Sequence, residues 1–225
     1  MSIPWACPHP QQGGSCEAYE AVAARIKPVG GTFTTRIGGG DAIFGGQFRC
    51  SLGFNVTKGG AAHFLTAGHC GNAAKTWFAN GAHTQALGST VTSNFPGKDF
   101  ALVKYTNAAV AHPSNVDLFN GSTQNITAAG KAKVGQAVKR SGSTTQVHSG
   151  TVTGLNATVN YAEGTVRGLI QTNVCAEGGD SGGALFAGTT ALGLTSGGSG
   201  NCTQGGETFF QPVTDALAAV GATLP

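Results

Sequence analysis

Two polar residues near the end of the chain lie among glycines, where they could support nucleophilic chemistry. The segment from Cys175 to Phe186 reads CAEGGDSGGALF, so four glycines flank the pair Asp180 and Ser181. A tight turn needs one or two glycines, because only glycine enters regions of positive φ without steric cost. Four glycines indicate backbone that another molecule approaches closely. A glycine-rich hairpin without chemistry is the alternative, and other parts of the chain must decide.

A nucleophilic serine needs a general base, an acid that orients this base, and backbone N–H donors for the developing oxyanion. His69 is the candidate base, because it follows the apolar segment 64–67 after a single glycine and directly precedes Cys70. A lone histidine at a strand end is more often structural. The candidate therefore depends on finding its partners.

Asp99 is the candidate acid, because it begins the apolar segment 100–103 and its carboxylate could be buried at a strand edge. A solvated Lys-Asp turn is the alternative. Three other aspartates adjoin no comparable apolar strand and are weaker candidates: Asp41, Asp117 and Asp215.

The elements that must position these residues are mostly strands. From about residue 48, short segments rich in Val, Thr, Phe and Leu alternate with Gly, Ser and Asn clusters, which is typical of a β-sandwich or barrel. Segments 49–56, 100–105 and 147–161 are examples. Helical patterns occur at 16–26 and 212–220 only. The sequence therefore predicts an all-β fold with a short C-terminal helix.

Composition excludes several classes of protein. The chain has 225 residues, of which 40% are hydrophobic and 10% charged, so it can bury a sizeable core. Its 13 Lys and Arg residues are scattered and form no basic stripe, so we expect no nucleic-acid partner. No apolar run approaches the ~18 residues of a membrane span.

Six widely spaced cysteines include no Cys-x-x-Cys pair, so the pattern favours disulfides over a zinc or redox site. We expect no metal and no cofactor. Disulfides indicate an oxidising compartment, and therefore a secreted, extracellular protein. The first twelve residues lack a basic region followed by an apolar one, so we expect the signal peptide to be absent from this sequence. Five Asn-x-Ser/Thr sequons leave glycosylation undecided.

The motifs TAGHC, KDFALVKY and GGDSGG follow one another in the order His69, Asp99 and Ser181, and they resemble the serine endopeptidases of the chymotrypsin fold. Further segments such as RCSLGFNV, LNATVNYAEG and TFFQPVTDAL are similar to the secreted bacterial streptogrisins, from about Ile37 to the C-terminus. The resemblance implies two six-stranded antiparallel Greek-key barrels with the active site between them. It divides the chain into an N-terminal extension (1–36), a first barrel (37–128) and a second barrel (129–225).

The resemblance also implies a role for each catalytic group. Ser181 attacks the substrate carbonyl, His69 moves the proton, and Asp99 orients the imidazole. The N–H groups of Gly179 and Ser181 form the oxyanion hole. Arg140 pairs with Asp180, in place of the freed N-terminal amine that animal members of the fold use.

For substrate binding, the resemblance implies a pocket for P1, which is the substrate residue before the cleaved bond. Two segments form the walls of this pocket, and an edge strand pairs with the substrate backbone. No fixed positive charge is evident there, so we expect large apolar P1 residues. Glu207 departs from the family pattern and suggests basic P1 residues as an alternative, although an outward orientation is favoured. The implied substrate-binding residues are Ala176, Glu177, Gly178, Thr195, Ser196, Gly197, Gly198 and Thr208.

The implied disulfides are Cys50–Cys70 and Cys175–Cys202, which leaves Cys7–Cys16 in the extension. We expect cleavage between Arg36 and Ile37, because mature relatives begin at the corresponding point. The expected partners are polypeptide substrates and protein protease inhibitors. An inactive precursor, or a non-catalytic binding protein on the same fold, is the alternative.

Overall fold

The structure is a computed structural model that describes residues 36–225. The helix expected over 16–26 and the disulfide expected between Cys7 and Cys16 lie outside the described residues.

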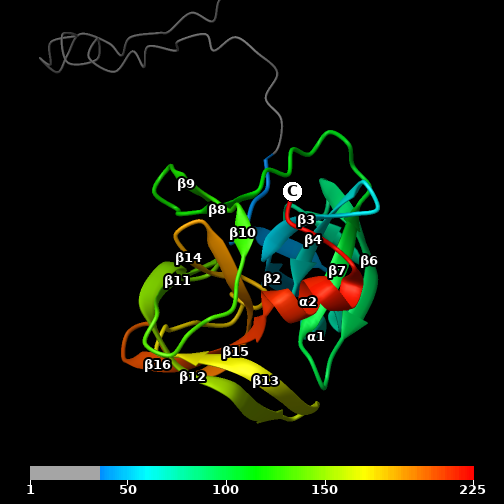
Figure 1. The fold of residues 1–225 in the computed structure, drawn as a ribbon. Helices are drawn as coiled ribbons and strands as arrows, with labels where there is room; N and C mark the ends of the chain where they lie inside the picture. Colours follow the sequence, from blue (N-terminus) through cyan, green and yellow to red (C-terminus); the bar gives the residue numbers. More distant parts are fainter. Residues whose placement is uncertain (1–35) are drawn as a thin grey trace, which may run out of the picture. The chain divides into compact units, whose positions relative to one another are not determined.

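The first sheet consists of seven antiparallel strands in the order β2-β1-β5-β6-β7-β4-β3. Figure 1 labels its strands β3, β4, β7 and β6. Its two end strands, β2 and β3, are separated in the chain by Leu52 and Gly53 alone. The two strands therefore act as one bent strand that closes a six-membered barrel. The strands are β1 (Ala42–Gly45), β2 (Phe48–Ser51), β3 (Phe54–Lys58), β4 (Ala61–Thr66), β5 (Thr76–Phe78), β6 (Ala86–Asn94) and β7 (Phe100–Tyr105).

The second sheet has the order β10-β15-β14-β11-β12-β13-β16, and an additional pairing of β15 with β16 closes six of these strands into a ring. The remaining strand, β10, runs parallel to β15 at the edge of this ring. The strands are β10 (Ala128–Ala129), β11 (Ala137–Gly142), β12 (Gln146–Tyr161), β13 (Gly164–Thr172), β14 (Ala184–Ala187), β15 (Thr190–Asn201) and β16 (Gly205–Pro212). A small separate sheet pairs β8 (Asn115–Asp117) with β9 (Thr123–Asn125).

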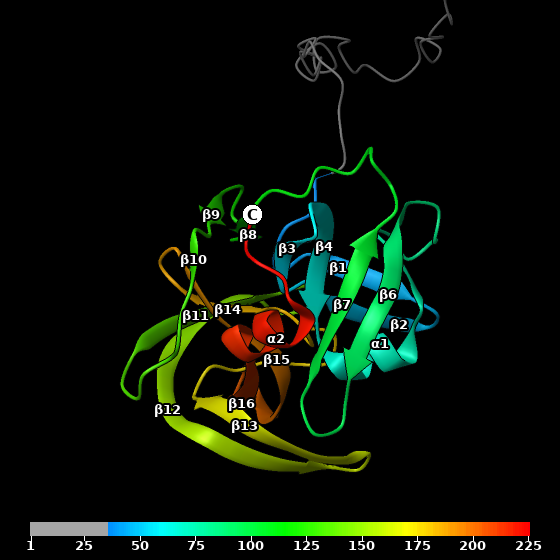
Figure 2. The ribbon, with the colours of Figure 1, turned by 45° about the vertical axis from the view of Figure 1, so that its right-hand side comes forward.

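Among residues 36–225, two short helices complete the fold, α1 (Gly68–Ala73) and α2 (Val213–Val220). Helix α2 ends at Gly221, which has the left-handed φ of 63° that a glycine adopts without steric cost. Its apolar face packs into a buried cluster that contains Leu65 of the first sheet and Leu194 of the second. Figure 2 shows α2 in red beside both sheets.

Each sheet also has a core of its own, because alternate residues of its strands face inward. Trp77 and Phe64 are buried in the first core, and Ile170 and Phe210 in the second. The predicted fold class, all-β with two barrels and a short C-terminal helix, is confirmed. Within residues 36–225, no helix is long and apolar enough to cross a membrane.

Candidate active site

The pairing of two strands brings His69 and Asp99 together. Strands β4 and β7 are antiparallel neighbours, with Thr66 opposite Ala101, so the end of β4 lies beside the start of β7. His69 follows β4 in the first turn of α1, and Asp99 directly precedes β7. His69 Nδ1 lies 3.0 Å from Asp99 Oδ2, and the His69 backbone N–H donates to Asp99 Oδ1 at 3.0 Å. The carboxylate therefore fixes both the backbone and the ring of the histidine.

Asp99 is fully buried, and its carboxylate accepts a third donor, the hydroxyl of Ser196 at 2.6 Å. Ser196 reaches it because of an irregularity in β15. Thr195 pairs with Phe210 of β16 while Gly197 pairs with Phe209, so two residues of β15 correspond to one step along β16. Such a bulge redirects a side chain, and here it is associated with a hydroxyl directed at the buried carboxylate.

Tyr161 extends this network toward the edge of the second barrel. Its hydroxyl lies 3.0 Å from Ser196 Oγ, and burial raises the pKa of the phenol while the Ser196 hydrogen bond opposes the shift. A Cβ atom at Gly197 would come within 2.8 Å of the Tyr161 ring. Glycine at position 197 therefore lets the aromatic ring lie against the backbone of β15.

Ser181 and His69 both line a cavity of about 520 Å³. No hydrogen bond between their side chains occurs among those of residues 36–225. A catalytic hydrogen bond is often long in an unliganded site and shortens when substrate binds. Phe95 also lines the cavity, and its ring packs edge-on against His69 at a centroid distance of 5.6 Å. The arrangement thus places a hydroxyl and an oriented imidazole on one accessible surface.

The turn around Ser181 needs glycine at two positions for reasons that the structure makes specific. Gly179 and Gly182 have φ values of 96° and 83°. A Cβ atom at Gly179 would lie 2.4 Å from Thr144 Oγ1, and one at Gly182 would lie 2.1 Å from Thr66 Oγ1. Neighbouring segments of the protein itself therefore exclude side chains at both positions.

Within residues 36–225, the backbone N–H groups of this turn differ in whether they have an acceptor. Asp180 N donates to Glu177 O, and Gly182 N donates to Thr195 O. In contrast, no hydrogen bond within the described part of the chain starts from the N–H of Gly179 or Ser181. Two unused donors beside a hydroxyl are the arrangement that stabilises an oxyanion.

A short loop between β11 and β12 supports the turn. The hydroxyls of Ser51 and Ser143 donate to Gly179 O at 2.8 and 3.1 Å. Thr144 Oγ1 donates to Gly178 O at 2.7 Å. Gly178 O shares a peptide plane with the N–H of Gly179, so the loop fixes the direction of that N–H. Ser51 of β2 and Ser143 of the loop hold the carbonyl of Gly179.

Asp180 is fully buried, and every one of its close partners is a donor or a cation. Oδ1 accepts from the N–H groups of Thr144 and Thr145 at 2.9 and 3.1 Å, and Oδ2 accepts from Glu177 N at 3.0 Å and from the Thr145 hydroxyl at 2.6 Å. Arg140 Nη1 lies 3.3 Å from Oδ1. Multiple donors and a cation together compensate the burial of the charge.

Arg140 is itself fully buried, and burial lowers its pKa while Asp180 opposes the shift. The guanidinium also donates to Gln146 O and to Cys175 O, each at 2.9 Å, and to the Thr145 hydroxyl. The structure therefore joins Arg140 and Asp180 in one buried ion pair.

The remaining residues singled out in the sequence lie around the turn but away from the cavity lining. Thr195 and Thr208 are buried, and their hydroxyls donate to the carbonyls of Gly183 and Val174. Ala176 is half-buried, Gly178 is exposed, and Gly198 is an exposed position of β15. Glu207 accepts a hydrogen bond from the Gln171 side chain of the adjacent strand.

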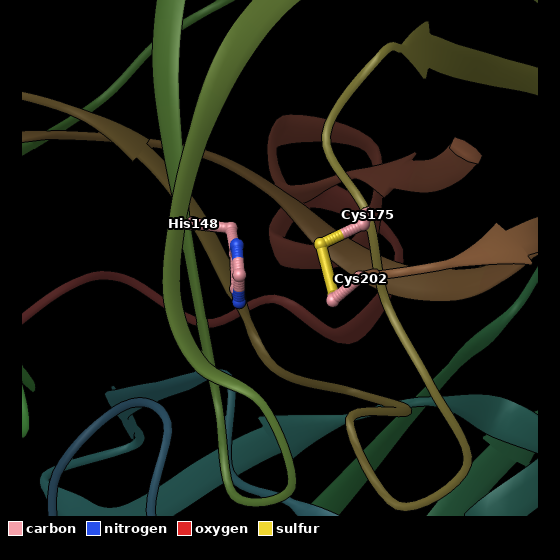
Figure 3. A group of neighbouring side chains, drawn as sticks. All are labelled: His148, Cys175 and Cys202. Carbon is pink, nitrogen blue, oxygen red and sulfur yellow. A yellow bond between two sulfur atoms is a disulfide. The ribbon is translucent and has the colours of Figure 1, made fainter. Parts of the chain in front are cut away.

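Two disulfides flank the segments that contain His69 and Ser181, Cys50–Cys70 and Cys175–Cys202. Figure 3 shows the side chain of His148 beside the second bridge. A ring nitrogen of His148 and the two sulfurs lie within 4.8 Å of one another. A metal site of this type requires thiolates, and both sulfurs are consumed by the disulfide, so the group does not form a thiolate site.

The comparisons with known proteins agree with this geometry. The Trypsin family model matches residues 37–220. Streptogrisin-D of Streptomyces griseus is 62% identical over 202 residues, which are 89% of this chain and 51% of that protein. Serine protease 2 of Streptomyces fradiae is 62% identical over 175 residues, which are 76% of this chain and all of that protein.

Among solved structures, a glutamic acid specific serine protease described as using a histidine triad in substrate binding superposes with a TM-score of 0.81. It is 51% identical and covers 84% of this chain and all of its own. The chain therefore belongs to the trypsin family, as its resemblance to the streptogrisins predicts. It spans about half the length of Streptogrisin-D and 64% of Streptogrisin-A of Streptomyces griseus.

Proposed function

We propose that this chain is a serine endopeptidase that hydrolyses polypeptides through a Ser181-His69-Asp99 triad. The observation that carries the proposal is the buried Asp99 carboxylate, which holds His69 by ring and backbone on a cavity that Ser181 shares. The membership of the trypsin family supports it.

In the proposed mechanism, His69 Nε2 accepts the proton of Ser181 as its Oγ attacks the substrate carbonyl carbon. The carbonyl oxygen becomes an oxyanion that accepts hydrogen bonds from the N–H groups of Gly179 and Ser181, and loss of one such donor typically costs about 2.7–4 kcal/mol. The imidazolium then protonates the leaving amine, which produces an acyl-enzyme. Water, deprotonated by His69, attacks the ester carbonyl and releases the acid and Ser181.

Asp99 assists these reaction steps in two ways. Its hydrogen bond to Nδ1 keeps the proton on that nitrogen, so that Nε2 is free to accept the serine proton. Its negative charge then stabilises the imidazolium in a site where neighbouring side chains exclude water.

We propose that the substrate backbone pairs with β15 at Ser196–Gly198, beyond the point where its pairing with β14 ends, a mode in which a peptide adds a strand to a sheet edge. Ala176, Thr195 and Thr208 form the surrounding wall of the P1 pocket and favour large apolar side chains. The Glu207 carboxylate contacts Gln171, which supports an outward orientation and no basic preference. In the glutamic acid specific neighbour a histidine triad binds substrate, whereas the wall proposed here contains no histidine.

The proposal also includes secretion, division of the chain at residues 36 and 128, and removal of residues 1–36 by cleavage before Ile37. Disulfide bonds support secretion. Protein protease inhibitors that enter the cleft as substrates do are expected partners. N-terminal sequencing of the wild type beside Ser181→Ala tests the maturation step, because only self-processing requires the serine.

A fluorophosphonate probe tests the central proposal, because it reacts with an activated serine and not with an ordinary one. We expect labelling of the wild-type chain at Ser181 and hydrolysis of unfolded polypeptide, with both lost in Ser181→Ala. Ser149→Ala is a matched control, since it removes an exposed hydroxyl of β12 outside the cavity lining. Absence of labelling and hydrolysis in the wild type would favour an inactive precursor or a binding protein.

A further inference from the structure

Arg49 is an exposed cation at one end of the cavity that contains Ser181 and His69. It lies on β2 beside Phe48, whose side chain is 57% exposed and lines the same cavity. The catalytic sequence described above uses neither side chain. A large apolar surface and a cation are thus both available beside the nucleophile.

The Arg49 guanidinium is held in place without being neutralised. Its Nη2 donates to Thr144 Oγ1 at 2.6 Å, and the group packs so closely against Gly179 that a Cβ there would lie 2.9 Å from Nη2. Within residues 36–225, no ion pair includes Arg49. A guanidinium has five N–H donors in a rigid fork, so most of them are free to bind an anion.

The position of β2 determines which part of a substrate meets this cation. Ser51 N donates to Ser181 O at 2.8 Å, so β2 runs directly beside the nucleophile from the first barrel. Residues before the cleaved bond are proposed to pair with β15 of the second barrel. The residues after the cleaved bond must therefore leave across β2, past Arg49 and Phe48.

The other charged groups of the cavity do not compete with Arg49 at this end. Besides Arg49 and the titratable His69, the lining contains one charged residue, Glu163. Glu163 lies next to Gly164, whose Cβ would come within 2.7 Å of Pro96. It therefore belongs to the part of the lining beside Pro96. The cation and the anion occupy different lining segments.

We propose that Arg49 determines leaving-group specificity, by selecting peptides with an acidic side chain at the first or second residue after the cleaved bond. The inference rests on the proposed protease function and deepens it. Phe48 supplies an apolar surface for the stem of the same residue.

Two sets of internally quenched peptides test this inference, with Asp, Asn or Lys at either of those two positions and an invariant acyl side. For the wild type we expect kcat/KM to be higher for Asp than for Lys by about three- to fivefold at one or both positions, the range of a partly exposed charge pair. Because such pairs are screened, the ratio should fall toward one in 0.5 M salt.

Variants at Arg49 then assign the preference. Arg49→Gln should bring the Asp-to-Lys ratio close to one, Arg49→Glu should invert it, and Arg49→Lys should retain part of it. Lys58→Gln removes an exposed positive charge at the end of β3, outside the cavity lining, and should leave the ratio at the wild-type value.

Three outcomes would overturn the inference in distinguishable ways. Equal ratios in the wild type and Arg49→Gln at both positions would remove Arg49 as the selecting residue. A uniform fall of kcat for all peptides, with the ratio unchanged, would make Arg49 a support of the Gly179 turn. If the wild type cleaves no peptide and Ser181 takes no fluorophosphonate, the protease proposal fails and this inference fails with it.

Discussion

Asp99 and Asp180 are both fully buried carboxylates close to Ser181, yet their surroundings differ in kind. Asp180 accepts three backbone N–H groups and one hydroxyl, and it faces the permanent charge of Arg140. Asp99 accepts one backbone N–H and the Ser196 hydroxyl, and its third partner is an imidazole.

The difference indicates which carboxylate can take part in a reaction. Arginine stays charged and its partners around Asp180 are fixed, so the charge balance there does not change during a catalytic cycle. The imidazole beside Asp99 can gain a proton, and the carboxylate then interacts with a cation that did not exist before. In the proposed mechanism, Asp180 therefore stabilises the turn, whereas Asp99 stabilises a transient charge.

Replacing Asp99 should separate activity from stability most strongly. We expect Asp99→Asn to lower kcat by about 10⁴-fold, because an amide can donate to Nδ1 and favour the wrong imidazole tautomer. The fold should persist, since the side chain keeps its volume. Steady-state kinetics and thermal unfolding of Asp99→Asn check both expectations. An activity of this variant within tenfold of wild type would contradict the role assigned to Asp99.

Replacing Arg140 should have the opposite profile. Arg140→Ala leaves Asp180 without its cation, and we expect the free energy of unfolding to fall by about 3–5 kcal/mol. Activity should fall as a consequence of a less ordered turn. Lys139→Ala, at an exposed neighbouring position, is the control in urea unfolding. Equal stability of the two variants would show that the ion pair contributes nothing.

Removing the Ser196 hydroxyl tests whether the role of Asp99 depends on its second side-chain donor. We expect Ser196→Ala to cost about 1.5–3 kcal/mol in stability or in transition-state free energy, the range for hydrogen bonds to charged groups. Tyr161→Phe removes only the outer member of this network and should cost less. Measuring kcat and Tm of both variants shows which substitution costs more. A larger loss in Tyr161→Phe than in Ser196→Ala would contradict the expected order.

Asp41 offers a third case, a carboxylate without a cation. Burial, as the largest cause, raises its pKa to about 6, and nearby Asp117 adds to the shift. No ion pair among residues 36–225 includes it. Because its folded-state pKa exceeds the unfolded value, its contribution to stability is present below about pH 4 and is lost as the pH rises through about 6.

Asp41→Asn should therefore be neutral near pH 4 and stabilising at pH 8. We expect a gain of about 1–2 kcal/mol at pH 8, less than the full shift implies, because the side chain is partly exposed. The amide oxygen can still accept the hydrogen bond of Gly38 N. Urea unfolding at both pH values checks the sign, and a loss of stability at pH 8 would contradict it.

Much of this molecule follows from local sequence patterns. The apolar segments at 100–105 and 147–161 correspond to β7 and β12, and the C-terminal pattern corresponds to α2. His69 and Asp99 could be proposed because each adjoins an apolar strand, so a short-range signal marked them. Ser181 could be proposed because it lies among the four glycines of the motif GGDSGG.

The support of the site could not be predicted in the same way. Ser196, which donates to Asp99, lies 97 residues away from it in the chain. Ser51, which donates to Gly179, lies 128 residues away from it. Whether Ser196 faces Asp99 depends on a one-residue bulge, and a shift of one residue in a strand reverses the direction of its side chain. Arg49 and Tyr161 had no local signal either, since both positions are ordinary in a β-strand.

The hydrogen bond from Ser51 N to Ser181 O joins two parts of the chain that a division of the gene would separate. The codons for His69 and Asp99 precede those for Ser181 and Ser196, and the connection at residues 106–114 contains no strand. Neither part encodes a complete set of reacting groups. Each part also carries part of the buried cluster that the two sheets share, so we expect two such fragments to recover the proposed activity only when they associate.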